Sequence, residues 1–462
     1  MRQTDVPRRT LALDAGFYLL SAAFAGVSAL FSQFYGYRIW GALAVFGYLA
    51  GLLQALVLLA DRANRANLAG PDESTTVAAR LDRLLRSRNT PIGLITLLGL
   101  VMPLIVLIIR RLQGVPWAEQ PEVWTIERSA TLLLRHGTPY TDFATLGRPP
   151  VAADYTPYGV AMSVFGIPHA LFGLSALTDA RIAFAVVSVL IVAIALRVLG
   201  WPSVPTRTRQ LVLACPLTAL TFAVAGDDLP IVALLLLALA LLHRRRPVLC
   251  GGVIAIAVSI KLTASPALIV LAVAVLGMLG RRALLRFTVA VLGAGAVLTV
   301  PVLLVDPHDF VEQVVKFPLG LGIARSPAAS PLPGVLIGEL GPAGHATAIG
   351  LMLAAALAIG CWLVLRPPRL ASDAAMRSAI GLGAAIMLSP ATRYGYLVYP
   401  IALFGAALAL REWEKPRAEP VGEPDTSAVS DTRAVPDASA MPDASVSLSA
   451  ASAVPDRSSL SR

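Results

Sequence analysis

The sequence predicts an all-α, polytopic membrane protein. Of its 462 residues, 56% are apolar and only 14% are charged, whereas a soluble domain averages about 25% charged residues. The mean hydropathy is +0.72. A bilayer core of about 30 Å requires about 20 apolar residues for each spanning helix, and the chain contains many runs close to that length. This composition excludes an ordinary soluble enzyme and a disordered protein.

Twelve apolar runs are predicted to span the membrane. They cover residues 11–32, 39–60, 92–110, 181–200, 209–226, 229–243, 247–262, 264–280, 285–305, 343–366, 376–390 and 396–412. Several runs are shorter than a full span. Short helices are tolerated in membranes where they line a cavity within the protein.

Arginine clusters predict the orientation of the chain. They lie at the N-terminus, between residues 61 and 91, at 243–246, at 281–286 and at 366–369. With a cytoplasmic N-terminus, alternation through twelve spans places every cluster on the cytoplasmic side, as the positive-inside rule requires. Arg110 and Arg111 are the exception. The same orientation places both termini on the cytoplasmic side of the cell membrane. The clusters also account for the net charge of +10, so we expect no nucleic acid partner.

Three parts are expected along the chain. Residues 1–91 form two additional N-terminal transmembrane helices and a basic cytoplasmic loop, and residues 92–412 form the membrane core. Residues 413–462 are rich in Ala, Ser, Pro and Asp, and such a composition predicts a disordered cytoplasmic tail. Two long loops, about 111–180 and 306–342, are expected on the exterior, with an apolar surface helix over 157–177.

The first exterior loop carries two candidate acids. Apolar residues from Val123 to Leu134 recur at helical spacing, which predicts a short amphipathic helix that ends near Gly137. Glu122 lies in its first turn and Glu127 lies one turn later. Either carboxylate could act as a general base on a hydroxyl. Alternatively, Glu122 stabilises the helix dipole and Glu127 lies on a solvated face.

Other polar side chains lie at the expected outer ends of helices. Lys261 lies between two apolar runs and is the only lysine before position 316, and an ionisable residue within membrane helices is a functional candidate. Its alternative is snorkelling to the headgroups. Arg393 lies at a similar depth. Asp227 and Asp228 lie at a hairpin tip, where capping a helix is the alternative role.

Acids and cations on one side of the membrane suit a particular reaction. A lysine or arginine at headgroup depth can neutralise a phosphate that leaves with negative charge. The combination therefore favours group transfer from a lipid-linked phosphate to a hydroxyl. The sequence contains no His/Cys cluster that is typical of a metal site, and no cofactor is expected. Binding of a divalent ion by the carboxylates is left as an alternative.

Three motifs resemble a known family. The first is His-Gly-Thr-Pro-Tyr at 136–140, followed by Asp-Tyr-Thr-Pro-Tyr at 154–158. The second is Ala-Gly-Asp-Asp-Leu-Pro at 225–230, followed by a leucine-rich helix, an arginine turn and the segment 251–266 around Lys261. The third is Leu-Ser-Pro at 388–390, followed by Arg393. In this order they resemble the GT-C glycosyltransferases, and most closely glycosyltransferase family 87, which includes polyprenol-phosphate-mannose-dependent mannosyltransferases. Thr156 stands where a proline is more usual, and Glu122 best matches a base that is usually an aspartate.

The resemblance implies an inverting, integral membrane hexosyltransferase of GT-C fold. It would transfer a sugar, by resemblance mannose, from a polyprenyl-phosphate donor to a hydroxyl of an envelope glycolipid or glycan on the extracytoplasmic side. The alternatives are a transporter or flippase, for which no internal repeat was found, and a scaffold protein. The implied site residues are Glu122 or Glu127 as base, Lys261 and Arg393 at the donor phosphate, and Asp227, Asp228 and Tyr158 at the substrates.

Overall fold

The computed structural model describes residues 6–65 and 85–415. Part of the basic loop between the second and third predicted spans and nearly all of the expected tail lie outside these residues. Within them the regular elements are all helices, and one isolated β-bridge joins Ala329 to Thr392. The predicted all-α fold is confirmed.

Eight helices in the described part of the chain are long and apolar enough to cross a membrane. They are α1 (Arg8–Phe31), α2 (Tyr35–Arg65), the continuous α4–η2–α5 unit (Asn89–Leu112), α8 (Ala180–Leu199), η7 with α13 (Leu262–Leu279), α14 (Arg281–Val305), α17 (Pro342–Leu365), and η9 with α19 (Tyr394–Trp413). A polytopic membrane protein is therefore confirmed. The expected number of twelve spans is not.

The other four predicted runs are helical but do not form long apolar helices. The run 209–226 is broken at Cys215, which has extended backbone angles and precedes Pro216. Proline lacks the N–H that would continue the helix. The corresponding elements are α9 (Thr206–Arg209), η6 (Gln210–Ala214), α10 (Pro216–Val224), α11 (Leu229–His243), α12 (Pro247–Ile260) and α18 (Ala371–Leu388).

Helix α11 is the centre of the main hydrophobic core. Twelve of its 15 residues are buried, and it packs against α8, α12, α18 and α19. A helix that is apolar on every side is stable only when it is surrounded by protein or lipid. Here the surroundings are protein, which explains how α11 can be shorter than a full span.

The two N-terminal helices are joined to the rest of the fold. Helices α1 and α2 pack against each other, and α2 also packs against α4, η2, α5 and α10. Asp14 of α1 is 2% exposed and forms ion pairs with Arg88 at 2.6 Å and Arg207 at 2.7 Å. The indole Nε1 of Trp40 donates to the carbonyl of Gly99 at 2.8 Å. The hairpin is therefore fixed by both polar and apolar contacts.

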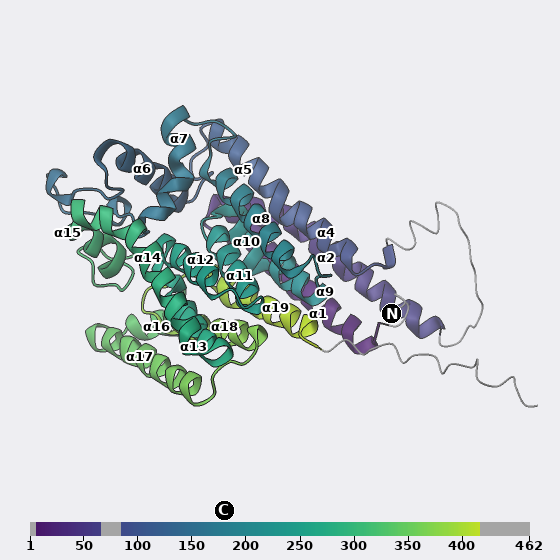
Figure 1. Cartoon of the computed structure of the whole chain (residues 1–462). Coiled ribbons are helices and arrows are strands. Elements are labelled where there is room, and N and C mark those ends of the chain that lie inside the picture. Colours follow the sequence, from purple (N-terminus) through teal and green to yellow (C-terminus); the bar gives the residue numbers. More distant parts are fainter. Residues whose placement is uncertain (1–5, 66–84, 416–462) are drawn as a thin grey trace, which may run out of the picture. The chain divides into compact units, whose positions relative to one another are not determined.

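The long loops contain the remaining elements. Helices α6 (Pro121–His136), α7 (Ile167–Phe172) and α15 (Pro307–Phe310) lie at one end of the described unit (Figure 1), here called the loop end. The amphipathic helix predicted after residue 120 is α6, and Gly137 ends it with a positive φ of 74°. Glycine adopts this left-handed conformation without steric cost.

The surface helix expected over 157–177 is not a single helix. A 3₁₀ segment, η5 (Val160–Gly166), precedes the short α7, and irregular turns follow. Gly166 approaches the α6 backbone so closely that an added Cβ would lie 2.5 Å from the carbonyl oxygen of Ile126. This packing holds the segment against α6.

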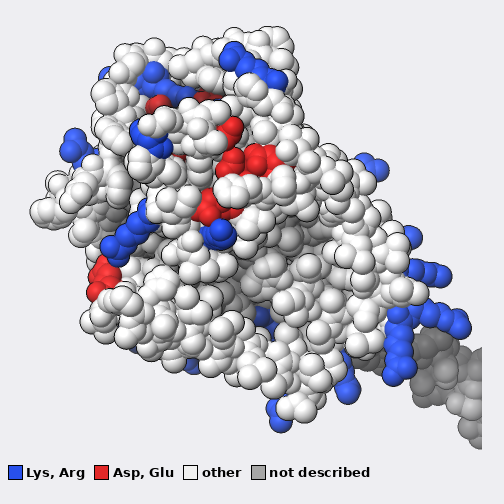
Figure 2. Space-filling model, turned by 90° about the vertical axis from the view of Figure 1, so that its left-hand side faces the viewer, with Lys and Arg blue, Asp and Glu red and all other residues white. Residues whose placement is uncertain are grey.

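The surface carries features of a membrane protein. Figure 2 shows a face that is mostly uncharged, with most of its acidic atoms gathered in the upper half. Trp117 follows α5 at the loop end and is 69% exposed, whereas Trp201 follows the opposite end of α8 and is 63% exposed. Exposed tryptophans are enriched at the two membrane–water interfaces.

Candidate active site

A cavity of about 400 Å³ lies between elements that are distant in the sequence. Its wall includes Glu122 from the start of α6, Tyr158 from the loop before η5, Lys261 from the α12–η7 junction, and Arg393 from the residue before η9. The structure thus brings together four of the residues that the sequence singled out. A carboxylate and two cations border one space.

The backbone geometry places Lys261 at this cavity. Helix α12 ends at Ile260, and Lys261 has extended backbone angles. The amide of Gly159 donates to the carbonyl of Ile260 at 3.0 Å, which ties the Tyr158 loop to the end of α12. A side chain at position 159 would overlap the carbonyl of Ser259, so this close approach requires glycine.

Two aspartates hold the Lys261 ammonium. Its Nζ donates to Asp228 at 2.6 Å and to Asp227 at 3.3 Å, and all three residues are buried. A buried ammonium is costly unless it is paired, and the two carboxylates supply that pairing.

The aspartates face Lys261 and do not form part of the cavity wall. The hydroxyl of Tyr399 donates to Asp228 at 2.5 Å, and that of Tyr158 donates to Asp227 at 3.4 Å. Among the described residues, no group of three or more His, Cys, Asp or Glu side chains is placed to hold a metal ion.

Glu122 combines an anchored oxygen with a free one. Its Oε1 forms an ion pair with a guanidinium nitrogen of Arg393. Its Oε2 is buried and has no hydrogen-bond partner in the described part of the chain. A buried carboxylate oxygen without a partner carries a desolvation cost, and it remains available to accept a proton from a group in the cavity.

Arg393 is held by its backbone. The amide of Thr392 donates to the carbonyl of Ala328 at 2.9 Å, and the amide of Ser330 donates back to the carbonyl of Thr392 at 3.0 Å. Burial would lower the pKa of Arg393, but the neighbouring Glu122 outweighs this and raises it. The second long loop thereby fixes the residue beside Arg393.

Aromatic rings surround the cations. Lys261 Nζ lies 4.6 Å from the ring centre of Tyr396 and 5.5 Å from that of Tyr158. Such cation–π contacts stabilise a buried ammonium. No pattern in the sequence singled out Tyr396 or Tyr399, although both follow Arg393 closely along the chain.

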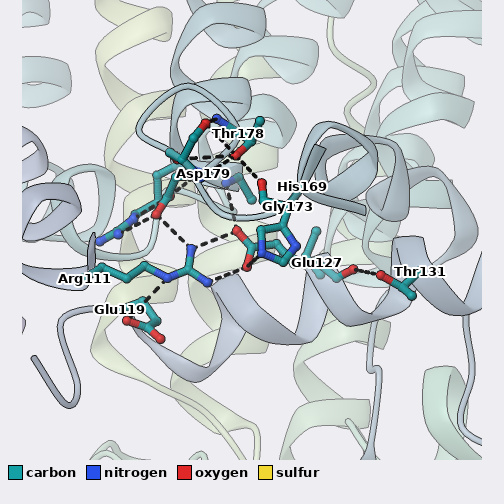
Figure 3. Close-up of polar contacts among 12 residues, drawn as sticks. Arg111, Glu119, Glu127, Thr131, His169, Gly173, Thr178 and Asp179 are labelled. Atoms are coloured by element: carbon teal, nitrogen blue, oxygen red, sulfur yellow. Dashed lines mark hydrogen bonds and ion pairs between the residues drawn. The ribbon is translucent and has the colours of Figure 1, made fainter. Parts of the chain in front are cut away.

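Glu127 lies outside the cavity wall. Its carboxylate accepts from Arg111 at 2.8 and 2.5 Å and from the amide of Ala180 at 3.1 Å (Figure 3). The side chain is 2% exposed. The interpretation of Glu127 as a solvated face residue is therefore wrong. Between the two candidate bases, only Glu122 borders the cavity.

A smaller apolar cavity adjoins the first. It has a volume of about 130 Å³ and shares Leu262 and Val314 with the larger one. The rest of its wall comes mainly from α12, α13 and α14, including Ala255, Leu268 and Val291. The two cavities together offer a charged space beside an apolar one.

Comparison with known proteins identifies the family. The model of glycosyltransferase family 87 matches residues 155–390, slightly more than half of the chain. The matched part includes Lys261 and the aspartates beside it, while Glu122 and Arg393 lie outside it. No curated protein and no solved structure matches the chain. The predicted family is thus confirmed, and the chain belongs to glycosyltransferase family 87.

Proposed function

We propose that the protein transfers a sugar from a polyprenyl-phosphate donor to a hydroxyl of a cell-envelope glycolipid or glycan. Membership of the family supports glycosyl transfer in general. The observation that carries the proposal is the convergence of Glu122, Lys261 and Arg393 on one cavity. The reaction requires a base to activate the attacking hydroxyl and cations to stabilise the departing phosphate. Both kinds of group border this cavity.

The cations are suited to hold the donor phosphate. An ammonium has three N–H donors, and Asp227 and Asp228 occupy two of those on Lys261. One donor remains for a ligand in the cavity. The guanidinium of Arg393 has five N–H donors and uses one of them on Glu122. Together the two side chains can donate charge-assisted hydrogen bonds to a phosphate as it leaves.

The apolar walls suit a lipid tail. Leu262, Leu382 and Ile386 border the larger cavity, and the lining of the smaller cavity beyond Leu262 is mainly apolar. A polyprenyl chain that enters from the bilayer would replace its contacts with lipid by contacts with these side chains. A nucleotide-linked sugar has no comparable apolar part.

Glu122 is the proposed catalytic base. Its free Oε2 accepts the proton of the acceptor hydroxyl while the hydroxyl oxygen forms a bond to the anomeric carbon. The bond from that carbon to the phosphate oxygen breaks, and its electron pair leaves with the polyprenyl phosphate. A single displacement of this kind inverts the anomeric configuration. Arg393 keeps the carboxylate in place through Oε1.

The reaction is proposed to take place outside the cytoplasm. The basic turn at 243–246 follows α11, and the cavity borders the opposite end of the neighbouring α12. With the basic turns in the cytoplasm, the cavity opens towards the outer leaflet and both termini are cytoplasmic. Mannose is the proposed sugar because the sequence motifs resemble those of mannosyltransferases.

The test is transfer of label in a defined system. The purified full chain in lipid vesicles is incubated with radiolabelled polyprenyl-phosphate-mannose and candidate envelope glycolipids, and in parallel with a nucleotide-linked mannose. We expect labelled glycolipid from the polyprenyl donor alone. Transfer from the nucleotide sugar, or movement of the donor lipid across the bilayer without transfer, would contradict the proposal, and the latter would favour a flippase.

A further inference from the structure

We propose that Arg111 and Glu127 are positioning residues that hold α6 so that Glu122 borders the cavity. The inference rests on the proposed role of Glu122 as base. It assigns a function to a buried ionic cluster that lies outside the cavity, and both Arg111 and Glu127 precede the part of the chain matched by the family model.

The cluster joins three helices (Figure 3). Arg111, at the end of α5, donates to Glu127 of α6 at 2.8 and 2.5 Å and to Asp179 at 2.8 Å. Asp179 precedes α8 and also accepts from the Arg181 guanidinium at 2.8 Å. Arg181 in turn donates to the carbonyl of Ala118 at 3.1 Å, in the loop that leads into α6.

The four charges of this cluster balance. Two guanidinium groups face two carboxylates, and all four side chains are at least 90% buried. Glu119 and His169 lie at the edge, at 3.5 Å from Arg111 and 3.8 Å from Glu127. The four buried groups are paired with one another and lie outside the cavity wall, so none of them faces a substrate there. What such a cluster provides is fixed geometry, because a buried ion is costly unless its partners stay in place.

The position of the cluster on α6 connects it to Glu122. Glu127 lies five residues after Glu122, which is about 7.5 Å along a helix. Next to Glu127, Arg128 donates to the carbonyl of Tyr155 at 3.0 Å, and Ser129 shares a hydrogen bond with Ser163 at 2.9 Å. One turn of α6 is thus fixed on several sides.

Glu122 itself is tied less firmly. Its carboxylate has one ionic partner in the described chain, Arg393. The position of the Glu122 backbone therefore depends on the turn of α6 that Glu127 anchors. A misplacement of about 1 Å at a reacting group can cost about 100-fold in rate. Loosening the anchor is expected to lower kcat without changing the donor site around Lys261.

A double-mutant cycle tests this connection in the full-length protein. Arg111→Lys keeps the charge but loses the paired contacts to Glu127, and Glu127→Gln keeps the shape but loses the charge. We expect about a 10- to 100-fold lower kcat in either variant, with donor affinity within about twofold of wild type. In the Glu122→Gln background the same changes should cost less than about twofold, because they act through Glu122. Arg148→Lys, in the exposed pair with Asp154, is the matched control and should remain fully active.

The outcomes separate two failures. Arg111→Lys could lower the residual activity of Glu122→Gln by the same factor as it lowers the activity of the wild type. That result would overturn the positioning role and leave the proposed base intact. Full activity of Glu122→Gln would remove the base, and the positioning proposal with it. Loss of the folded protein in both Arg111→Lys and Glu127→Gln would assign the cluster a purely structural role.

Discussion

Arg393 and Glu122 lie 271 positions apart in the sequence and form an ion pair at the wall of one cavity. The contact joins the residue before the last membrane helix to the first turn of α6. It leaves Oε2 of Glu122 without a partner in the described chain. Because the arginine holds one oxygen, the other is the atom that can receive a proton.

Replacing Glu122 by glutamine tests the base. Glu122→Gln keeps the shape and the contact to Arg393 but cannot accept the proton, so kcat is expected to fall by about 10²- to 10⁴-fold. Donor affinity should stay within about threefold, because the phosphate contacts are unchanged. Single-turnover transfer and equilibrium binding of the labelled donor measure the two quantities. Glu339→Gln is the control, since Glu339 is exposed and lies outside the cavity wall.

Removing the Lys261 charge tests the phosphate site. Lys261→Met is expected to weaken donor binding by about 10- to 100-fold, as for a lost hydrogen bond to a charged group. It also leaves Asp227 and Asp228 unpaired and should destabilise the fold by about 3–5 kcal/mol. The double variant Lys261→Met/Asp228→Asn should recover part of the stability but not the affinity.

The control for this prediction is Lys316→Met. Lys316 is half-exposed, pairs with Glu312 at 3.3 Å and lies outside the cavity wall, so its donor affinity should equal that of the wild type. Unchanged affinity in Lys261→Met would mean that the lysine only balances the aspartates.

A pair of glycines tests the packing behind the site. Gly159→Ala forces a Cβ into the carbonyl of Ser259, so the Tyr158 loop must move away from Lys261, and we expect about a tenfold or larger loss of activity. Gly252→Ala in α12 meets open space and should stabilise the helix by about 0.5–1 kcal/mol. Thermal unfolding and transfer rates of both variants provide the comparison. Equal transfer rates and equal unfolding temperatures in the two variants would show that the chain accommodates a Cβ at position 159 without a change at the site.

The buried Asp14 tests how the N-terminal hairpin is attached. Asp14→Asn removes the charge that Arg88 and Arg207 share and should lower stability by about 1.5–3 kcal/mol, as for lost hydrogen bonds to a charged group. Asp61→Asn breaks the more exposed pair with Arg86 and should cost at most about 1 kcal/mol. Thermal unfolding in detergent measures both. A loss in Asp14→Asn no larger than that in Asp61→Asn would contradict this attachment.

The sequence was sufficient for the helices and for part of the site. Hydropathy located the eight long apolar helices, because each must cover a bilayer. The isolated charge of Lys261 within apolar surroundings indicated a site, and the structure places Lys261 at the cavity with Glu122 and Arg393. The three residues come together because each lies where a helix begins or ends beside this cavity.

The rest of the site depends on ion pairs between residues that are distant in the sequence, and no local sequence pattern reveals these pairs. Arg111 disagreed with the charge rule for membrane orientation, and the reason is its burial against Glu127 and Asp179, which lie 16 and 68 positions away. Likewise, capping was the expected alternative role of Asp227 and Asp228, and both in fact contact Lys261. Pairing of this type arises only when the chain is folded.

Helix α12 has 14 residues and is about 21 Å long, which is some 9 Å less than the hydrocarbon thickness of a typical bilayer. Lys261 at its end is therefore recessed beneath the headgroups if the other end reaches the opposite surface. For the proposed lipid-linked sugar to reach Lys261, the sugar must then sink or the bilayer must thin. Turnover is therefore expected to depend on acyl-chain length, and slower reaction in vesicles of longer-chain lipids would reveal it.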